Sequence, residues 1–146
     1  MPSKIYTVDA SVFMNAFNPS ETGHAESRRL LEWMQQQPIP IIAPTLLLPE
    51  VAATISRGRN DAQLARAFAA NVSRLPHLTL VPLDTQLALQ AADIAAQHRL
   101  RGSDATYAAV ALRYGTTLVT LDREQHDRLL TVVATRYPVE ALHEVV

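Results

Sequence analysis

Four acidic residues of this sequence stand at positions from which their carboxylates could act together. They are Asp9, Glu50, Asp104 and Asp122. Carboxylates that converge on one site repel one another and partly take up protons unless a cation neutralises them, so such a group is stable mainly as a divalent metal site. Oxygen ligands favour Mg²⁺ or Mn²⁺ over zinc. An ion held in this way suits phosphoryl chemistry, because it orients a water and stabilises charge on the attacked phosphate.

Each acid taken alone also has a structural explanation to consider. Asp104 directly follows Ser103, the expected helix cap, and an acid in a first helical turn is stabilised by the helix dipole. Asp9 and Asp122 could be turn aspartates at strand ends. Glu50 is harder to explain in this way, because its surroundings in the sequence are apolar and a buried unpaired carboxylate is costly. The structural explanation of the three aspartates therefore stays open, and the metal site depends on the four acids together.

The order of the segments predicts what positions these acids. Short β-rich runs alternate with amphipathic helical runs, and this alternation is typical of an α/β sandwich with a mostly parallel central sheet. The predicted strands are 4–9, 39–44, 78–83, 116–122 and 131–135. The predicted helices are 10–17, 23–37, 45–59 with its regular part from Pro49, 60–76, 85–99, 104–114 and 124–130.

Two of the acids end predicted strands. Asp9 ends the run KIYTVD, and Asp122 ends the run TTLVTLD. Ligands of parallel α/β sheets bind beyond the carboxyl ends of the strands, at the point where the strand order reverses. If the first and fourth strands are neighbours, both carboxylates project from the same edge of the sheet.

Length and composition limit the class of protein. A chain of 146 residues with 48% hydrophobic and 18% charged residues fits one globular domain over 1–146. No apolar run approaches the roughly 20 residues that span a bilayer, and Met1 to Asp9 lacks a signal-peptide core, so we expect a cytoplasmic protein. The absence of cysteine excludes disulfides, thiolate zinc sites and cysteine nucleophiles.

Several other chemistries lack their residues. The four glycines form neither a dinucleotide-binding nor a Walker A pattern. Ser11 stands where haloacid-dehalogenase phosphatases carry a second aspartate, and Lys4, the single lysine, is too early in the chain for a response-regulator receiver. The five histidines show no metal-type pairing, and we expect His126 to be a surface helix residue.

The sequence resembles the PIN-domain ribonucleases, particularly the small VapC-like toxins of prokaryotic toxin–antitoxin pairs. The segments VDASVFMNAF, LLLPEVAATI, GSDATYAAVA and GTTLVTLD carry this resemblance, and they present Asp9, Glu50, Asp104 and Asp122 in the family's order. The resemblance implies a PIN-like three-layer α/β/α sandwich with about five strands. It also implies a Mg²⁺- or Mn²⁺-dependent endoribonuclease that hydrolyses RNA phosphodiester bonds, with these four acids as catalytic metal ligands. A homodimer, and an antitoxin that inserts into a groove beside the active site, are implied as well.

Further residues are candidates for supporting roles. The resemblance places Ser11 where its hydroxyl could bind a carboxylate or a metal-bound water, and Thr120 could act similarly; ordinary strand or cap hydroxyls are an equal explanation. Asp127 is expected to be a solvated helix residue. Five arginines could hold the RNA backbone beside the acids, although exposed surface arginines are at least as common. These are Arg57, Arg59, Arg99, Arg101 and Arg123.

A second hypothesis is a PIN-fold protein of weak activity that binds RNA or a protein partner. A complete set of four mutually repelling acids argues against it. A working site should bind Mn²⁺ and gain stability by mass action, whereas a binding module should be indifferent to the metal. An antitoxin gene immediately upstream would separate a toxin from a housekeeping nuclease.

Overall fold

A parallel sheet of five strands forms the centre of the structure, a computed structural model that describes residues 4–145. The strand order is β3-β2-β1-β4-β5, and all four strand pairs are parallel. The chain order therefore reverses between β1 and β4, which are neighbours, and this meets the condition for Asp9 and Asp122 to project from the same edge. The strands are β1 (Tyr6–Val8), β2 (Ile41–Pro44), β3 (Leu78–Val81), β4 (Thr117–Val119) and β5 (Thr135–Arg136).

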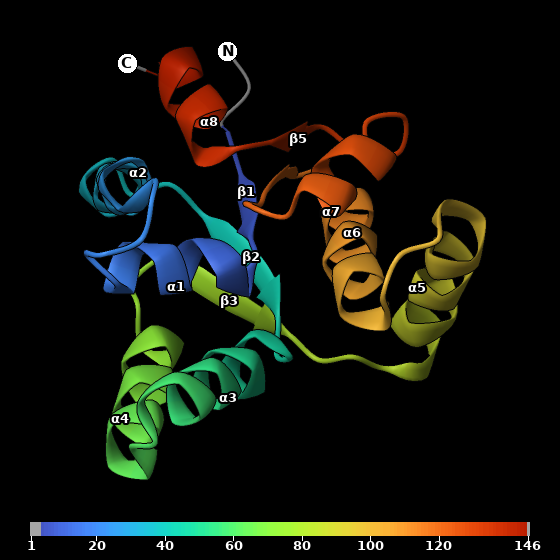
Figure 1. Ribbon diagram of the computed structural model, residues 1–146. Helices are drawn as coiled ribbons and strands as arrows, with labels where there is room; N and C mark the ends of the chain where they lie inside the picture. The colour runs from blue at the N-terminus through green and yellow to red at the C-terminus, as the bar shows by residue number, and fades with distance from the viewer. Residues whose placement is uncertain (1–3, 146) are drawn as a thin grey trace.

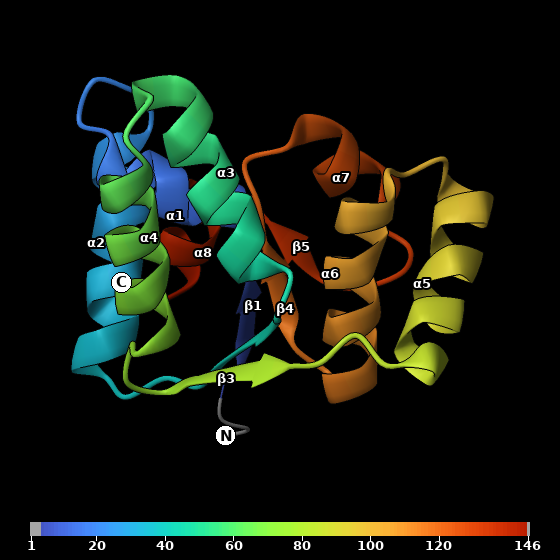
Figure 2. The same cartoon turned by 90° about the horizontal axis from the view of Figure 1, so that it is seen from below.

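Helices cover both faces of the sheet. Figure 1 and Figure 2 show α1 to α4 on one side of the sheet and α5 and α6 on the other. This arrangement confirms the predicted three-layer α/β/α sandwich. The helices are α1 (Ala10–Phe17), α2 (His24–Gln36), α3 (Leu47–Arg59), α4 (Ala62–Ser73), α5 (Thr85–His98), α6 (Gly102–Tyr114), α7 (Arg123–Arg128) and α8 (Pro138–Val145).

The core lies on both sides of the sheet, and α6 contributes its longest buried run. Residues 105 to 111 of α6 are all buried, and this helix packs against β1, β2 and β4. Four of these seven residues are alanine, and their small side chains let the helix approach the strands closely. Strands covered on both faces read as apolar runs, as Val8, Ile41 and Leu118 illustrate with fully buried side chains. The first turn of α6 is thereby fixed beside the end of β1.

Three predicted boundaries are wrong in ways that affect the acids. The N-cap of α6 is Arg101, in extended conformation, and not Ser103, which lies inside the helix. Asp104 remains in the first turn. Strand β4 ends at Val119, and Asp122 is the N-cap of α7, with its side chain accepting from the Gln125 backbone N–H at 2.9 Å. Helix α3 begins before Pro49, which the first turn tolerates because its missing N–H would have no helical partner there.

The C-terminal part of the chain departs further from the sequence prediction. Strand β5 covers only Thr135–Arg136 rather than 131–135, and the prediction missed α8, which packs against α2. The prediction of a surface His126 is also wrong. This side chain is buried, stacks on the Tyr137 ring at 3.9 Å and bonds Glu140 of α8 at 2.8 Å.

No helix within residues 4–145 combines the length and the apolar character that a membrane crossing would need.

Candidate active site

The four predicted acids line one pocket beyond the carboxyl ends of β1 and β4. Asp9 follows β1, Glu50 comes from α3, Asp104 from the first turn of α6, and Asp122 from the N-cap of α7. Four elements far apart in the sequence therefore contribute one carboxylate each.

Asp9 is the most buried of the four, with 5% of its surface exposed. It caps α1: its Oδ1 accepts from the Ser11 backbone N–H at 3.0 Å and from the Ser11 hydroxyl. Its Oδ2 accepts from the Thr120 hydroxyl at 2.6 Å. Burial, with a smaller contribution from the nearby Asp104, raises the pKa of Asp9 to about 6 despite these hydrogen bonds. The two hydroxyls predicted as supporting groups thus both contact this carboxylate.

Glu50 is paired with a buried tyrosine. Its Oε1 accepts from the Tyr107 hydroxyl at 2.7 Å, which joins α3 to α6 across the pocket. Burial raises the pKa of Glu50, the Tyr107 hydrogen bond lowers it, and Asp104 raises it again. Burial and Glu50 both raise the pKa of Tyr107, so its hydroxyl keeps its proton and stays a donor. The carboxylate that seemed unpaired in the sequence has this one neutral partner.

A single guanidinium connects the other two acids. Arg101 Nε donates to Asp104 Oδ2 at 3.1 Å, and Arg101 Nη2 donates to Asp122 Oδ2 at 2.7 Å. The Arg101 side chain is 71% exposed, whereas Asp104 and Asp122 are 13% and 25% exposed. Burial raises the pKa of Asp104, and the hydrogen bond and charge of Arg101 oppose that rise. The cation therefore lies at the mouth of the pocket, above two more enclosed acids.

A buried glutamine links the supports of these acids. Gln125 is fully buried, its side-chain amide donates to the Asp104 carbonyl at 3.3 Å, and its Oε1 lies 2.9 Å from the Thr120 hydroxyl. Thr120 also accepts from the Asp122 backbone N–H at 3.0 Å. Since the Thr120 hydroxyl has one proton, it can donate to either Asp9 or Gln125 at a given time.

The side chains of the pocket suit a divalent cation that prefers oxygen ligands, but they are not arranged as a complete metal site. The pocket offers carboxylate oxygens, and no histidine is among its lining residues. Across residues 4–145, no three His, Asp or Glu side chains lie close enough together to hold a metal ion. Each predicted acid instead has a protein partner: a hydroxyl for Asp9 and Glu50, and Arg101 for the other two. Carboxylate oxygens are suitable ligands for Mg²⁺ or Mn²⁺. For the four acids to bind one ion together, their present partners would have to move.

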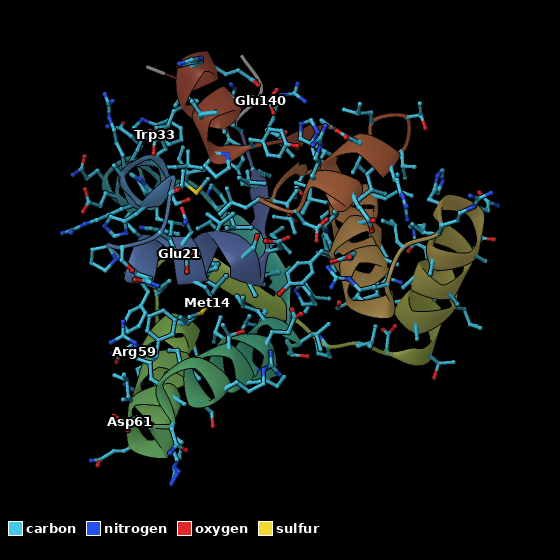
Figure 3. The ribbon with its side chains drawn as sticks, in the orientation of Figure 1. Met14, Glu21, Trp33, Arg59, Asp61 and Glu140 are labelled. Atoms are coloured by element: carbon cyan, nitrogen blue, oxygen red, sulfur yellow. The ribbon has the colours of Figure 1, made fainter. Side chains whose placement is uncertain are left out.

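Two of the five predicted arginines line the pocket, Arg57 and Arg101. The Arg59 guanidinium lies 5.1 Å from the centre of the Phe17 ring, away from the acids. Figure 3 shows Arg59 beyond Met14 of α1 and Glu21 of the following loop. Arg123 is exposed beside Asp127 at 3.9 Å, and Arg99 ends α5. Asp127 is 56% exposed and is not among the residues that line the pocket, as expected for a solvated helix residue.

Sequence reasoning missed three residues that shape this pocket. Tyr107 and Gln125 hold the acids, and Glu21 is a fifth acid in the lining, held by Asn15 at 3.1 Å and Asn18 at 3.2 Å. Tyr107 lies three residues after Asp104 and therefore on the same helix face, which is a signal that the sequence did contain. Glu21 lies in a loop and had no such signal.

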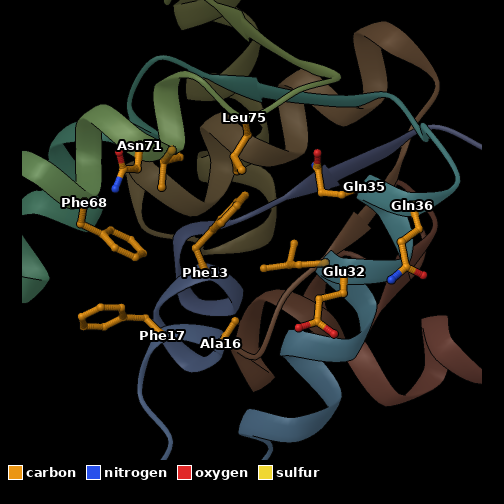
Figure 4. Close-up of a pocket in the computed structure, with 11 residues that line it drawn as sticks. Phe13, Ala16, Phe17, Glu32, Gln35, Gln36, Phe68, Asn71 and Leu75 are labelled. Atoms are coloured by element: carbon orange, nitrogen blue, oxygen red, sulfur yellow. The ribbon is translucent and has the colours of Figure 1, made fainter.

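An apolar groove lies beside the acidic pocket, between α1, α2 and α4. At one end the Phe17 and Phe68 rings pack edge to face, with 4.7 Å between the ring centres. Glu32, Gln35 and Gln36 line the opposite wall (Figure 4). The remaining lining residues are Phe13, Ala16, Leu31, Asn71, Val72 and Leu75.

Comparison with known proteins agrees with this fold. Among solved structures, VapC20 from Mycobacterium tuberculosis, a Sarcin-Ricin loop cleaving toxin, superposes with a TM-score of 0.70 at 20% identity, covering 82% of this chain and 92% of that one. PAE2754 from Pyrobaculum aerophilum gives 0.67 at 21% identity, covering 97% and 94%. VapBC2 from Rickettsia felis, solved with a DNA fragment from its promoter, gives 0.69 at 14% identity, covering 91% and 98%.

At these identities the likeness establishes the fold. A search of curated proteins finds no match. The sequence profile of the PIN domain matches residues 6–129, which include the four acids and every other residue that lines the acidic pocket. The chain is therefore a member of the PIN-domain family.

Proposed function

We propose that this protein is a Mg²⁺- or Mn²⁺-dependent endoribonuclease that hydrolyses RNA phosphodiester bonds, and that it is the toxin of a toxin–antitoxin pair. The observation that carries the proposal is the meeting of Asp9, Glu50, Asp104 and Asp122 in one pocket at the reversal of strand order. Membership of the PIN-domain family and the similarity in fold to VapC toxins support a toxin nuclease.

The four acids would hold the metal ion. When bound, such an ion orients a water, lowers the pKa of that water and stabilises negative charge on the phosphate. Ser11 and Thr120 fix the Asp9 carboxylate through hydrogen bonds to both of its oxygens. Tyr107 fixes Glu50 in the same way. Because burial raises the pKa of Asp9 to about 6, this carboxyl becomes a full anion only when the pH is well above 6 or a cation lies beside it.

Arginines would bind the RNA backbone. Arg57 and Arg101 line the pocket and could contact the phosphate under attack. Arg59, Arg99 and Arg123 lie outside the lining and would contact only more distant phosphates. Phosphate contacts of this kind are independent of base sequence and weaken with salt.

The apolar groove would receive the antitoxin. Phe17 lines both this groove and a small neighbouring pocket, which in turn shares Met14, Glu21 and Thr54 with the acidic pocket. A continuous track therefore runs from an apolar surface to a negative one. An antitoxin segment with an apolar helix face followed by a basic residue would match both parts of it.

Three further properties belong to the proposal. A homodimer is implied by the resemblance alone. A single domain over residues 1–146 extends the PIN match to include α8, which packs on α2. A cytoplasmic location would give the enzyme access to RNA.

Cleavage of a labelled structured RNA by the purified protein tests the proposal. Cleavage should require Mg²⁺ or Mn²⁺, stop with EDTA, and fall at least about 100-fold in Asp104→Asn, since the loss of even a ligand-supporting group costs 10- to 100-fold. Asp127→Asn is the matched control, because it removes an equal charge outside the pocket and should keep activity. Cleavage that survives Asp104→Asn would contradict the proposed site.

One observation favours the weakly active binding module as a second candidate. Arg101 already neutralises two of the acids, as a cation would in a site that no longer needs a metal. Thermal unfolding with Mn²⁺ separates the two candidates: an enzyme site should be stabilised by the metal, whereas a pure binding module should be unaffected.

A further inference from the structure

We infer that Arg101 is a built-in counter-cation of the candidate active site, which divalent metal ions must displace before they can bind. The inference rests on the proposed function, because it assumes that the acids hold a metal. It adds a specific role to a residue that the sequence suggested only as a contact for RNA.

The geometry places this guanidinium between two acids that come from different elements. Arg101 precedes α6, Asp104 lies in the first turn of that helix, and Asp122 lies beyond β4. Distances of 3.1 Å and 2.7 Å, from two different nitrogens of the same guanidinium, mean that the planar fork holds both carboxylates at once. No other arginine or lysine forms an ion pair with these two acids within residues 4–145.

The same two oxygens cannot serve both cations fully. Asp104 Oδ2 and Asp122 Oδ2 both accept hydrogen bonds from Arg101. Each carboxylate has one other oxygen, and that of Asp122, Oδ1, accepts from the Gln125 backbone N–H. A metal ion that used these oxygens would meet a positive charge in contact with them. Binding of the metal ion would have to break these two ion pairs, and the free energy of breaking them is subtracted from that of metal binding. Arg101 therefore lowers metal affinity in the free protein.

The exposure of Arg101 makes its displacement feasible. At 71% exposed, the side chain has room to turn outward, and an exposed ion pair is a modest barrier. A guanidinium released at the mouth of the pocket is then free to bind a phosphate, the anion that its fork matches. The binding of a substrate phosphate would in this way remove a competitor of the metal ion.

Isothermal titration of the metal-free protein with Mn²⁺, without RNA, tests the inference. Arg101→Gln should bind Mn²⁺ at least about fivefold more tightly than the wild type, near the lower end of typical coupling between ligands because the ion pairs are exposed. Arg57→Gln is the matched control. It removes an equal charge from the same pocket without breaking a contact with Asp104 or Asp122, so its gain should be about twofold or less.

Two further measurements guard against trivial explanations. Arg101→Lys keeps the charge but loses the fork, so its Mn²⁺ affinity should lie between those of the wild type and Arg101→Gln. Thermal unfolding should show each variant folded without metal, and Mn²⁺ should raise the melting temperature most in Arg101→Gln.

The outcomes separate this inference from the proposed function. If the wild type binds Mn²⁺ and Arg101→Gln gains no more than Arg57→Gln, Arg101 is no competitor, and the proposed nuclease stands. Weaker binding in Arg101→Gln would show that Arg101 assembles the acids, which also overturns the inference. If neither the wild type nor Arg101→Gln binds Mn²⁺, both the inference and the metal-dependent function fail.

Discussion

The acidic pocket and the apolar groove are built in opposite ways, although they share one helix. Helix α1 begins at the buried Asp9 cap and ends at Phe17, whose ring lines the groove. The pocket gathers single polar side chains from strand ends and first helical turns. The groove consists of the side faces of three helices and contains two aromatic rings in contact.

The pocket and the groove each carry a different energetic cost in the free protein. In the pocket, the buried Asp9 and the partly buried Glu50 and Asp104 have pKa values raised by burial, so their ionised forms are costly without a cation. In the groove, the cost is apolar surface left in contact with water. The pocket should therefore respond to metal and pH, and the groove should respond to an apolar partner. The contrast can be tested by changing one region and measuring both responses.

The largest expected effect is the pH dependence of Asp9→Asn. Burial raises the pKa of Asp9 from 3.8, the value in the unfolded chain, to about 6 in the folded protein. Protonated Asp9 therefore costs the fold nothing below pH 4, and the free energy of unfolding falls as the pH rises through 6. The difference amounts to about 3 kcal/mol. Asp9→Asn should therefore gain stability relative to the metal-free wild type by about that amount between pH 4 and pH 7, measured by urea unfolding.

The local hydrogen bonds let asparagine replace Asp9 without disruption. Its Oδ1 can accept from Ser11, its amide can donate to the Thr120 oxygen, and Thr120 can then donate to Gln125. Asp93→Asn, which removes one carboxylate at an exposed position of α5 outside the pocket, is the matched control. A gap between Asp9→Asn and wild type that stays constant from pH 4 to pH 7 would contradict the burial argument.

A smaller effect is expected at the groove. Phe17→Ala removes half of the aromatic pair, and we expect it to weaken binding of the proposed antitoxin by about 2 kcal/mol, the scale of an interface hot spot. Leu89→Ala is the control, since Leu89 is 67% exposed on α5, across the sheet from the groove (Figure 1). Metal-dependent cleavage should be preserved in both variants. Equal binding by both variants would remove the groove from the proposed interface.

The acids of the pocket could be predicted because their signals are local. Asp9 and Asp122 follow apolar β-rich runs, and Glu50 interrupts an apolar helix. A parallel sheet places the carboxyl ends of its strands at one edge, and the sequence left open whether β1 and β4 are neighbours, which the pairing of Tyr6 with Thr117 shows. The partners of the acids depend on tertiary contacts instead. Gln125 reaches its position because Asp122, predicted as the last strand residue, is instead the N-cap of α7, which begins at Arg123.

The residues that line the groove, and the C-terminal region, could not be predicted for a related reason. An apolar face on a helix has the same sequence pattern whether it covers the core or lines a groove, as Trp33 against Tyr6 and Leu31 in the groove show for the same helix α2. His126 was expected on the surface because its own helix is polar. It is buried because Tyr137 and Glu140, contributed by the missed region around α8, pack against it.

The smallest effect concerns how one carboxylate of the pocket is tuned. Tyr107→Phe removes the hydrogen bond that lowers the pKa of Glu50 against the effect of burial, so the pKa of Glu50 should rise further. The titration of the Glu50 carboxyl, followed by NMR in the metal-free protein, should therefore move to higher pH, with the cleavage rate well above pH 6 nearly unchanged. Tyr114→Phe, at an exposed position near the end of α6, should leave the titration in place. A uniform loss of rate in Tyr107→Phe without a shift would mean that Tyr107 positions Glu50 and does not tune its charge.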